Sequence, residues 1–155
     1  MKKNELGEKV MILANIGVIF GILLLVFELN QNRELMRAQL RADYAGMLIG
    51  QIRSVYENPD LAALMVEGGC AEEVGFSCNS VDDLRYSLYW RGRFRSWENL
   101  HYQYRVGLYD EAEFLASREG WRTLLTNPKI AANWSSGRSI YSPEFAAEMD
   151  ALLPD

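Results

Sequence analysis

The chain has 155 residues and a formal net charge of −5 at pH 7, with 21 acidic residues, 16 basic residues and a single histidine. Acidic and basic residues are interspersed, and this balance argues against a general surface for polyanions, so no nucleic-acid partner is predicted. No internal repeat and no catalytic or cofactor motif stands out in the sequence. The sequence therefore names no reaction, no cofactor and no small-molecule substrate.

A long apolar run near the start is the first predicted element. Residues 10–27 carry no charge, Asn15 is their only strongly polar side chain, and thirteen of them are Val, Ile, Leu or Phe. As a helix the run rises about 27 Å, close to the roughly 30 Å hydrocarbon core of a bilayer. A soluble core helix would show polar residues at helical spacing, and a cleavable signal would need small residues just past the run. We therefore predict a permanent single transmembrane helix over residues 10–27, preceded by a tail over residues 1–9.

Small residues inside this span suggest a contact between helices. Gly17 and Gly21 form a GxxxG pattern, and Ala14 lies one turn earlier on nearly the same face. Small side chains let two helices approach closely in lipid, where packing drives association. Glycine is also common in membrane helices that do not associate. The pattern nevertheless favours either self-association or docking on a larger membrane protein.

The helical pattern continues past the span without a break as far as Asn58. Apolar residues follow at three- and four-residue steps, which predicts one helix of about fifty residues with a stripe that must be covered. The residues of this stripe are Leu29, Met36, Leu40, Tyr44, Met47, Leu48, Ile52 and Val55.

Helix boundaries are marked by capping residues, prolines and glycines. Asn58-Pro59, Asn127-Pro128 and Ser142-Pro143 each mark a helix start, and Ser80 with Asp83 and Asp110 with Glu113 resemble capping boxes. No segment alternates with a period of two, so no strands are expected. The predicted helices cover residues 59–67, 81–106, 111–126, 128–136 and 143–153, with ends at Gly68-Gly69, Gly107 and Gly137. Residues 28–155 are thus predicted to form an all-α extramembrane domain, a small bundle around the long first helix.

Three segments together resemble a known family. The stretches FELNQNRELMRAQ, RFRSWENLHYQYRVGLYDEAEF and SPEFAAEMDALL are similar to those of a family of short, uncharacterised bacterial single-pass membrane proteins. The similarity covers roughly residues 10 to 153 and implies one N-terminal span, a polar Asn/Gln collar and a helical domain. It implies no activity. The GGCAEEVGFSCNS loop departs from the pattern, which has no associated cysteine pair.

The helix predicted over residues 81–106 carries an aromatic stripe with interleaved arginines. One interpretation is a nucleic-acid surface with rings stacked on bases, and the other is a buried aromatic core with a solvated outer face. The acidic balance of the domain favours the core interpretation. Polar residues of the same helix are expected to join the aromatic ones in a network between helices. The predicted network comprises Trp97, Glu98, Asn99, His101, Tyr102, Gln103 and Tyr104.

The only histidine raises one enzymatic alternative. Glu98 and His101 form Glu-x-x-His, the spacing found in ferritin-like di-metal bundles. Such a site needs two of these motifs and two further carboxylates, so it would require a symmetric dimer. A histidine satisfied in the core is the simpler interpretation, and no metal ligand is assigned.

Two features of the sequence bear on which side of the membrane the domain lies: the charges that flank the span and the pair of cysteines. Lys2, Lys3 and Lys9 precede the span and Arg33, Arg37 and Arg41 follow it, so the positive-inside rule gives a tie. Cys70 and Cys78 lie in one predicted loop that can bring them to bonding distance, although two unpaired thiols would also fit the sequence. Disulfides persist in the periplasm and are rare in the cytosol. The expectation is therefore a bacterial inner-membrane protein with a periplasmic interaction domain, either an accessory subunit of a membrane complex or a self-associating scaffold.

Overall fold

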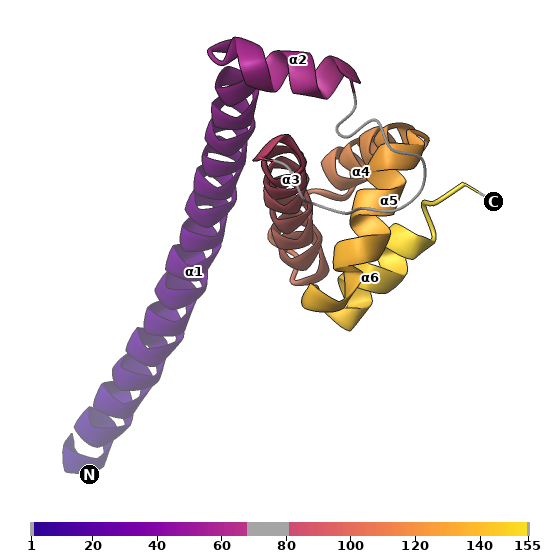
Figure 1. Ribbon diagram of the computed structural model, residues 1–155. Coiled ribbons are helices and arrows are strands. Elements are labelled where there is room, and N and C mark those ends of the chain that lie inside the picture. Colours follow the sequence, from indigo (N-terminus) through magenta and orange to yellow (C-terminus); the bar gives the residue numbers. More distant parts are fainter. Residues whose placement is uncertain (1, 68–80, 155) are drawn as a thin grey trace. The chain divides into compact units, whose positions relative to one another are not determined.

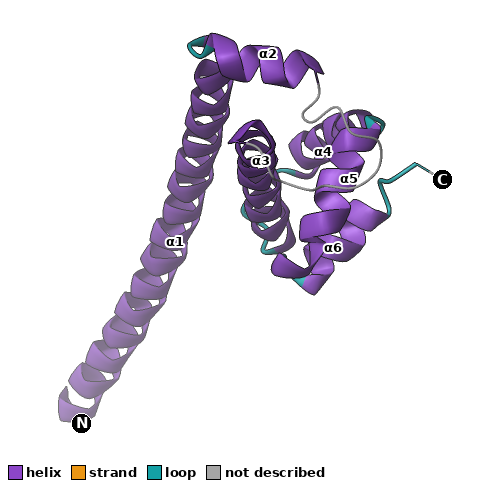
Figure 2. Ribbon diagram, in the orientation of Figure 1, coloured by secondary structure: helices purple, strands orange, loops and turns teal. Residues whose placement is uncertain are grey.

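The computed structural model describes residues 2–67 and 81–154, without the side chains of residues 2–6 and 67. The described residues form helices and no strand, so the predicted all-α class is confirmed (Figure 2). In chain order the elements are α1 (Lys2–Tyr56), α2 (Pro59–Glu67), α3 (Val81–Arg105), α4 (Glu111–Leu125), α5 (Pro128–Gly137), the 3-10 helix η1 (Arg138–Ile140) and α6 (Pro143–Asp150) (Figure 1).

Three predicted helix starts are confirmed by their side-chain caps. Asn58 Oδ1 accepts from the N–H of Leu61 at 3.1 Å, and Asn127 Oδ1 accepts from the N–H of Lys129 at 3.0 Å. Asp110 Oδ1 accepts from two N–H groups of the first turn of α4. Each oxygen satisfies donors that have no partner inside the helix, which is why these short polar residues fix the boundaries.

Two predicted caps differ in detail. Ser142 precedes α6, but its hydroxyl makes no capping bond; its own N–H donates instead to Glu98 Oε1 on α3. Glu113 does not complete a capping box with Asp110, because its carboxylate pairs with Arg41 at 2.7 Å. In both places a glutamate carboxylate binds a residue that is distant in the sequence: Glu98 binds Ser142, and Glu113 binds Arg41. Capping patterns relate residues within one turn, so they do not predict such contacts.

The helix ends follow the predicted glycines only in part. Gly107 has φ +73°, a conformation that favours glycine. It lies in the turn that follows the end of α3, as a glycine after a helix C-terminus commonly does. Gly137 is the last residue of α5 and has a φ of −103°, so the chain continues into η1 without a left-handed cap. Helix α6 ends at Asp150, earlier than the predicted residue 153, because residues 151 and 152 form a turn. The predicted capping residue Ser80 and the glycine pair Gly68-Gly69 lie outside the described residues.

The chain divides into two compact units, Met1–Gln39 and Leu40–Asp155. The first consists of the N-terminal part of α1, and the second contains the rest of α1 and the remaining helices. This division by packing falls twelve residues beyond residue 27, where the sequence predicts the end of the transmembrane segment. The two boundaries mark different things, since one records contacts within the chain and the other a change of side-chain polarity.

The core of the second unit is aromatic. Trp97 stacks on Trp121 with ring centroids 5.2 Å apart, and Phe94 meets the edges of Trp97 and Trp134. Phe145 of α6 closes the cluster against Trp134 at 5.5 Å. Stacked and edge-on pairs of this kind add to the stabilisation from burial alone. The aromatic stripe of α3 therefore lies in the core, where its rings meet side chains of α4, α5 and α6.

Within the second unit, α1 contributes one half-buried face. That face consists of Leu40, Tyr44, Met47, Leu48, Gln51 and Val55. Tyr44 meets Tyr109 edge-on at 6.2 Å, and Gln51 Oε1 accepts from Arg93 of α3 at 2.9 Å. The predicted stripe is thus covered only in part. Ile52, which the sequence placed in the same stripe, is exposed and lies on another face.

Candidate functional site

The first candidate site is the apolar segment of α1. One helix in the part of the chain that the structure describes is long and apolar enough to cross a membrane, and none of its apolar window is buried. A Cβ added at Gly17 or Gly21 would meet no other atom within 4 Å, so the chain's own packing does not require glycine there. The small stripe of Ala14, Gly17 and Gly21 is therefore open to a partner outside the chain.

The second candidate site is the polar and aromatic set on α3, and the structure separates its members. Trp97 is buried in the core, and Tyr104 stacks on Phe114 with ring centroids 4.1 Å apart. Gln103 is buried, and its backbone carbonyl accepts from the N–H groups of the turn after α3. Trp97 and Tyr104 thus pack α3 against α4 through their rings, whereas Gln103 fixes the turn between the two helices through its backbone.

Glu98 is the polar centre of this set. Its Oε1 accepts from the N–H of Ser142 at 2.7 Å, and its Oε2 pairs with Arg95. The Arg95 guanidinium also donates to the carbonyl of Ile140 at 3.2 Å and lies over the ring of Tyr141 at 4.7 Å. Glu98 thus places a carboxylate at the N-terminus of α6, where the helix dipole favours negative charge, and joins that helix to α3.

His101 lies on the same helix but in different surroundings. Its ring is buried between Phe114 of α4 at 6.0 Å and Phe145 of α6 at 5.8 Å. Burial lowers the pKa of His101, because it disfavours the charged imidazolium, and the nearby carboxylate of Glu148 opposes the shift. Among residues 7–66 and 81–154, no three His, Cys, Asp or Glu side chains gather closely enough to hold a metal ion. Glu98 and His101 therefore have separate partners in the described chain.

Asn99 and Tyr102 do not join the interhelical contacts. Both are exposed and line an open groove of about 640 Å³ beside α3. The groove is completed by Met47, Gly92, Arg95, Ser96, Glu98 and Ser142. A second groove of about 450 Å³ is mainly apolar and lies between α1, α2, α3 and α5, with Ile52, Met65, Tyr89 and Trp90 among its lining residues. Both grooves are open surfaces of the second unit.

Several structural contacts were not predicted from the sequence. Arg118 of α4 pairs with Glu148 of α6, and Asp150 accepts from both Trp134 Nε1 at 3.0 Å and Arg138 Nε at 2.7 Å. The Arg138 bond holds the pKa of the Asp150 carboxyl below its usual value. Apart from Arg138, the residues that make these contacts could be identified in the sequence as members of predicted helices. Their pairing could not be predicted, because no spacing rule relates residues of two different helices. The cysteine pair, Cys70 and Cys78, lies outside the described residues.

Comparisons with known proteins give no further assignment: no family model, no curated protein and no solved structure matches the chain.

Proposed function

We propose that the chain is a membrane-anchored interaction or assembly protein of the bacterial inner membrane. In this proposal residues 10–27 span the bilayer, and the helical unit acts as a self-associating scaffold or as an accessory subunit of a membrane complex. The observation that carries the proposal is the uncovered apolar helix, in which the stripe of Ala14, Gly17 and Gly21 has open space beside it. Lipid covers apolar side chains that the protein leaves exposed, and small residues provide a surface for a second helix.

The experiment that tests this proposal is an oligomerisation assay in membranes. Gly17→Ile with Gly21→Ile should weaken association without preventing insertion, since isoleucine is at least as apolar as glycine. Ile19→Phe with Leu23→Phe is the control, because these positions lie on the opposite side of the helix and also receive larger apolar side chains. Equal association of the glycine variant and the unmodified chain would remove this stripe as the contact face.

The proposal also places the helical unit in the periplasm and the N-terminus in the cytoplasm. A bridge between Cys70 and Cys78 would close a loop of nine residues and stabilise the fold by about 2.5 kcal/mol in the chain-entropy model. Thiol labelling of intact cells tests this topology. Labelling by a permeant reagent should require prior reduction in the unmodified chain, whereas Cys70→Ser should leave Cys78 reactive without reduction. Labelling of the unmodified chain before reduction would contradict the bridge and remove the main support for the periplasmic side.

A further inference from the structure

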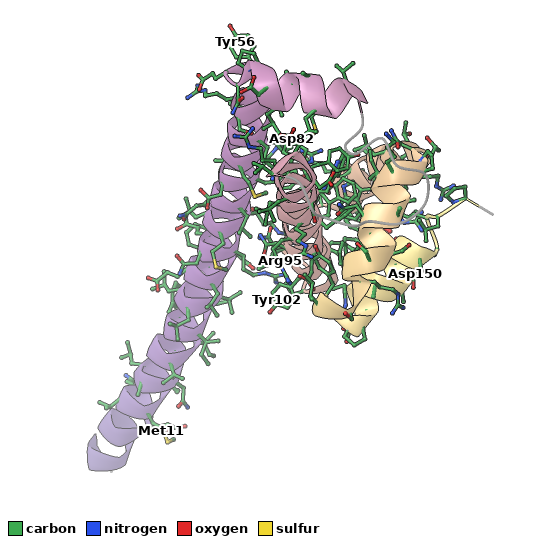
Figure 3. All side chains as sticks on the ribbon, viewed as in Figure 1. Met11, Tyr56, Asp82, Arg95, Tyr102 and Asp150 are labelled. Carbon is green, nitrogen blue, oxygen red and sulfur yellow. The ribbon has the colours of Figure 1, made fainter. Side chains whose placement is uncertain are left out.

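A second face of α1 carries a regular apolar pattern that the second unit leaves uncovered. Ala42, Ala45, Ile49, Ile52 and Tyr56 follow one another at alternating steps of three and four residues. All five are exposed, including Ile49 at 57%, Ile52 at 64% and Tyr56 at 83%. We call these five residues the outer seam. Tyr56 stands at the end of α1 (Figure 3), and Tyr56 and Ile52 also line the open apolar groove beside α2 and α3.

The outer seam is distinct from the face of α1 that packs on its own unit. At about 100° per residue the two faces are centred roughly 130° apart around the helix. Tyr44, Met47 and Gln51 belong to the half-buried face, whereas Ile49 and Ile52 belong to the seam. One helix therefore presents two apolar faces. The second unit half-buries the first, and it reaches the second only at Ile52 and Tyr56, which line an open groove and stay exposed.

The spacing of the seam is that of a coiled coil. Alternating steps of three and four residues average 3.5, so Ala42, Ile49 and Tyr56 take a positions and Ala45 and Ile52 take d positions of a heptad repeat. In the sequence the same spacing continues back to Ala38 and Leu35, so the pattern covers about three heptads without a charged residue at a or d. A face with this period is complementary to another helix of the same period.

Charges beside the seam are compatible with a second copy. Arg53, at an e position, pairs with Glu57, the residue that follows α1, and Arg41, at a g position, pairs with Glu113 of α4. In a parallel pair Arg41 faces Gly46 of the other copy and Arg53 faces Leu48, so no two like charges are opposed. The flanking arginines thus have partners within each chain and leave the seam free of repulsion.

We propose that the outer seam is the face on which a second copy of this chain docks, forming a parallel pair of α1 helices. This inference rests on the proposed function, since anchors in one bilayer hold two copies in the same polarity and raise their effective concentration. It adds a named contact surface outside the transmembrane segment. The small side chains of Ala42 and Ala45 would let the two helix backbones approach closely. Ile49 and Ile52 would supply most of the apolar surface that the pair buries.

Cysteine cross-linking of the full chain in native membranes tests the seam. In a Cys70→Ser, Cys78→Ser background, Ala45→Cys, Ile49→Cys and Ile52→Cys should each form a disulfide-linked dimer under mild oxidation, because equivalent a or d positions meet in a parallel pair. Ser54→Cys is the matched control, since Ser54 is exposed on the same helix but lies away from the seam. Cross-linking at Ser54 equal to that at the three seam positions would overturn the assignment.

The mass of the chain in mild detergent separates this inference from the proposed function. Ile49→Lys with Ile52→Lys adds charge to an exposed face and should leave the fold intact, which a melting curve checks. The dimer should weaken about tenfold or more, since two buried lysines cost at least the 1.4 kcal/mol that a factor of ten represents. If this variant stays dimeric while Gly17→Ile with Gly21→Ile becomes monomeric, the seam is wrong and the proposed function stands. If the unmodified chain is monomeric and does not cross-link, the seam and the self-associating scaffold both fail, and only the accessory-subunit form of the proposed function stands.

Discussion

Residues 10–27 and helix α3 are both rich in large apolar side chains, yet the two regions treat them in opposite ways. In the first, residues such as Phe20 and Leu24 are about 60% exposed, and none of the apolar window is buried. In α3, Trp97, Phe94 and Leu100 are almost completely buried. The difference follows from side-chain pattern, because polar residues interrupt α3 at helical spacing, whereas Asn15 is the only strongly polar side chain of residues 10–27. Apolar content alone does not place a helix in a protein core. A helix that packs on a soluble core is amphipathic, with one apolar face toward the protein and one polar face toward water.

The largest expected effect concerns the aromatic core. Trp97→Ala should lower the free energy of unfolding by roughly 3–5 kcal/mol, because it removes a buried ring that stacks on Trp121. Thermal unfolding of the detergent-solubilised chain, followed by circular dichroism, measures the loss. Leu24→Ala is the counterpart in the other region and should leave this transition in place. A similar loss of stability in both variants would abolish the distinction between the two regions.

A smaller effect is expected at the contact between α3 and α6. Glu98→Ala removes the acceptor for the Ser142 N–H and the partner of Arg95, and should cost roughly 1.5–3 kcal/mol, the range for a hydrogen bond to a charged group. Glu144→Ala is the control on the first turn of α6, since its pair with Arg105 is long and exposed. Denaturant unfolding compares the two. An equally small loss of unfolding free energy in the two variants would show that Glu98 does not stabilise the contact between α3 and α6.

The smallest expected effect is a dependence of stability on pH. Because burial lowers the pKa of His101, the unfolded chain binds this proton more readily than the folded chain. The contribution of His101 is therefore complete above its ordinary pKa of about 6.5 and is lost as the pH falls below that value toward the lowered pKa of the folded chain. Asp150, with its lowered pKa, titrates below this range.

Melting temperatures at about pH 7.5 and pH 5.5 measure the contribution of His101. The unmodified chain should be less stable at the lower pH, and His101→Gln should show a smaller difference between the two values. If the variant shows the same difference, another group carries the pH dependence.

Features that depend on neighbouring residues could be predicted from the sequence. The starts of α2, α4 and α5 were readable because Asn58, Asp110 and Asn127 act within one turn of themselves. The spacing of the aromatic residues of α3 also predicted correctly that this face of the helix is buried. Contacts between distant residues were not readable: Glu98 meets Ser142 forty-four residues away, and no spacing rule relates them.

The two faces of α1 show why the candidate site was harder to predict than the fold. Tyr44, Val55 and Ile52 all fit three- and four-residue steps, so the sequence read them as one stripe. Burial separates them, because the second unit covers Tyr44 and Val55 but leaves Ile52 exposed. Periodicity shows that a helix has apolar surface; which part of that surface the chain itself covers depends on tertiary packing.

The measurement that tests the central claim most directly is site-specific labelling in native membranes. Single cysteines at Leu24 and Tyr102, in a Cys70→Ser, Cys78→Ser background, are treated with a water-soluble maleimide under conditions that admit it to both faces of the membrane. Both side chains are about 60% exposed in the chain alone, so protein burial does not distinguish them. Leu24→Cys should resist labelling because lipid covers it, and Tyr102→Cys should react fully in water. Equal labelling at the two positions would contradict a transmembrane role for residues 10–27.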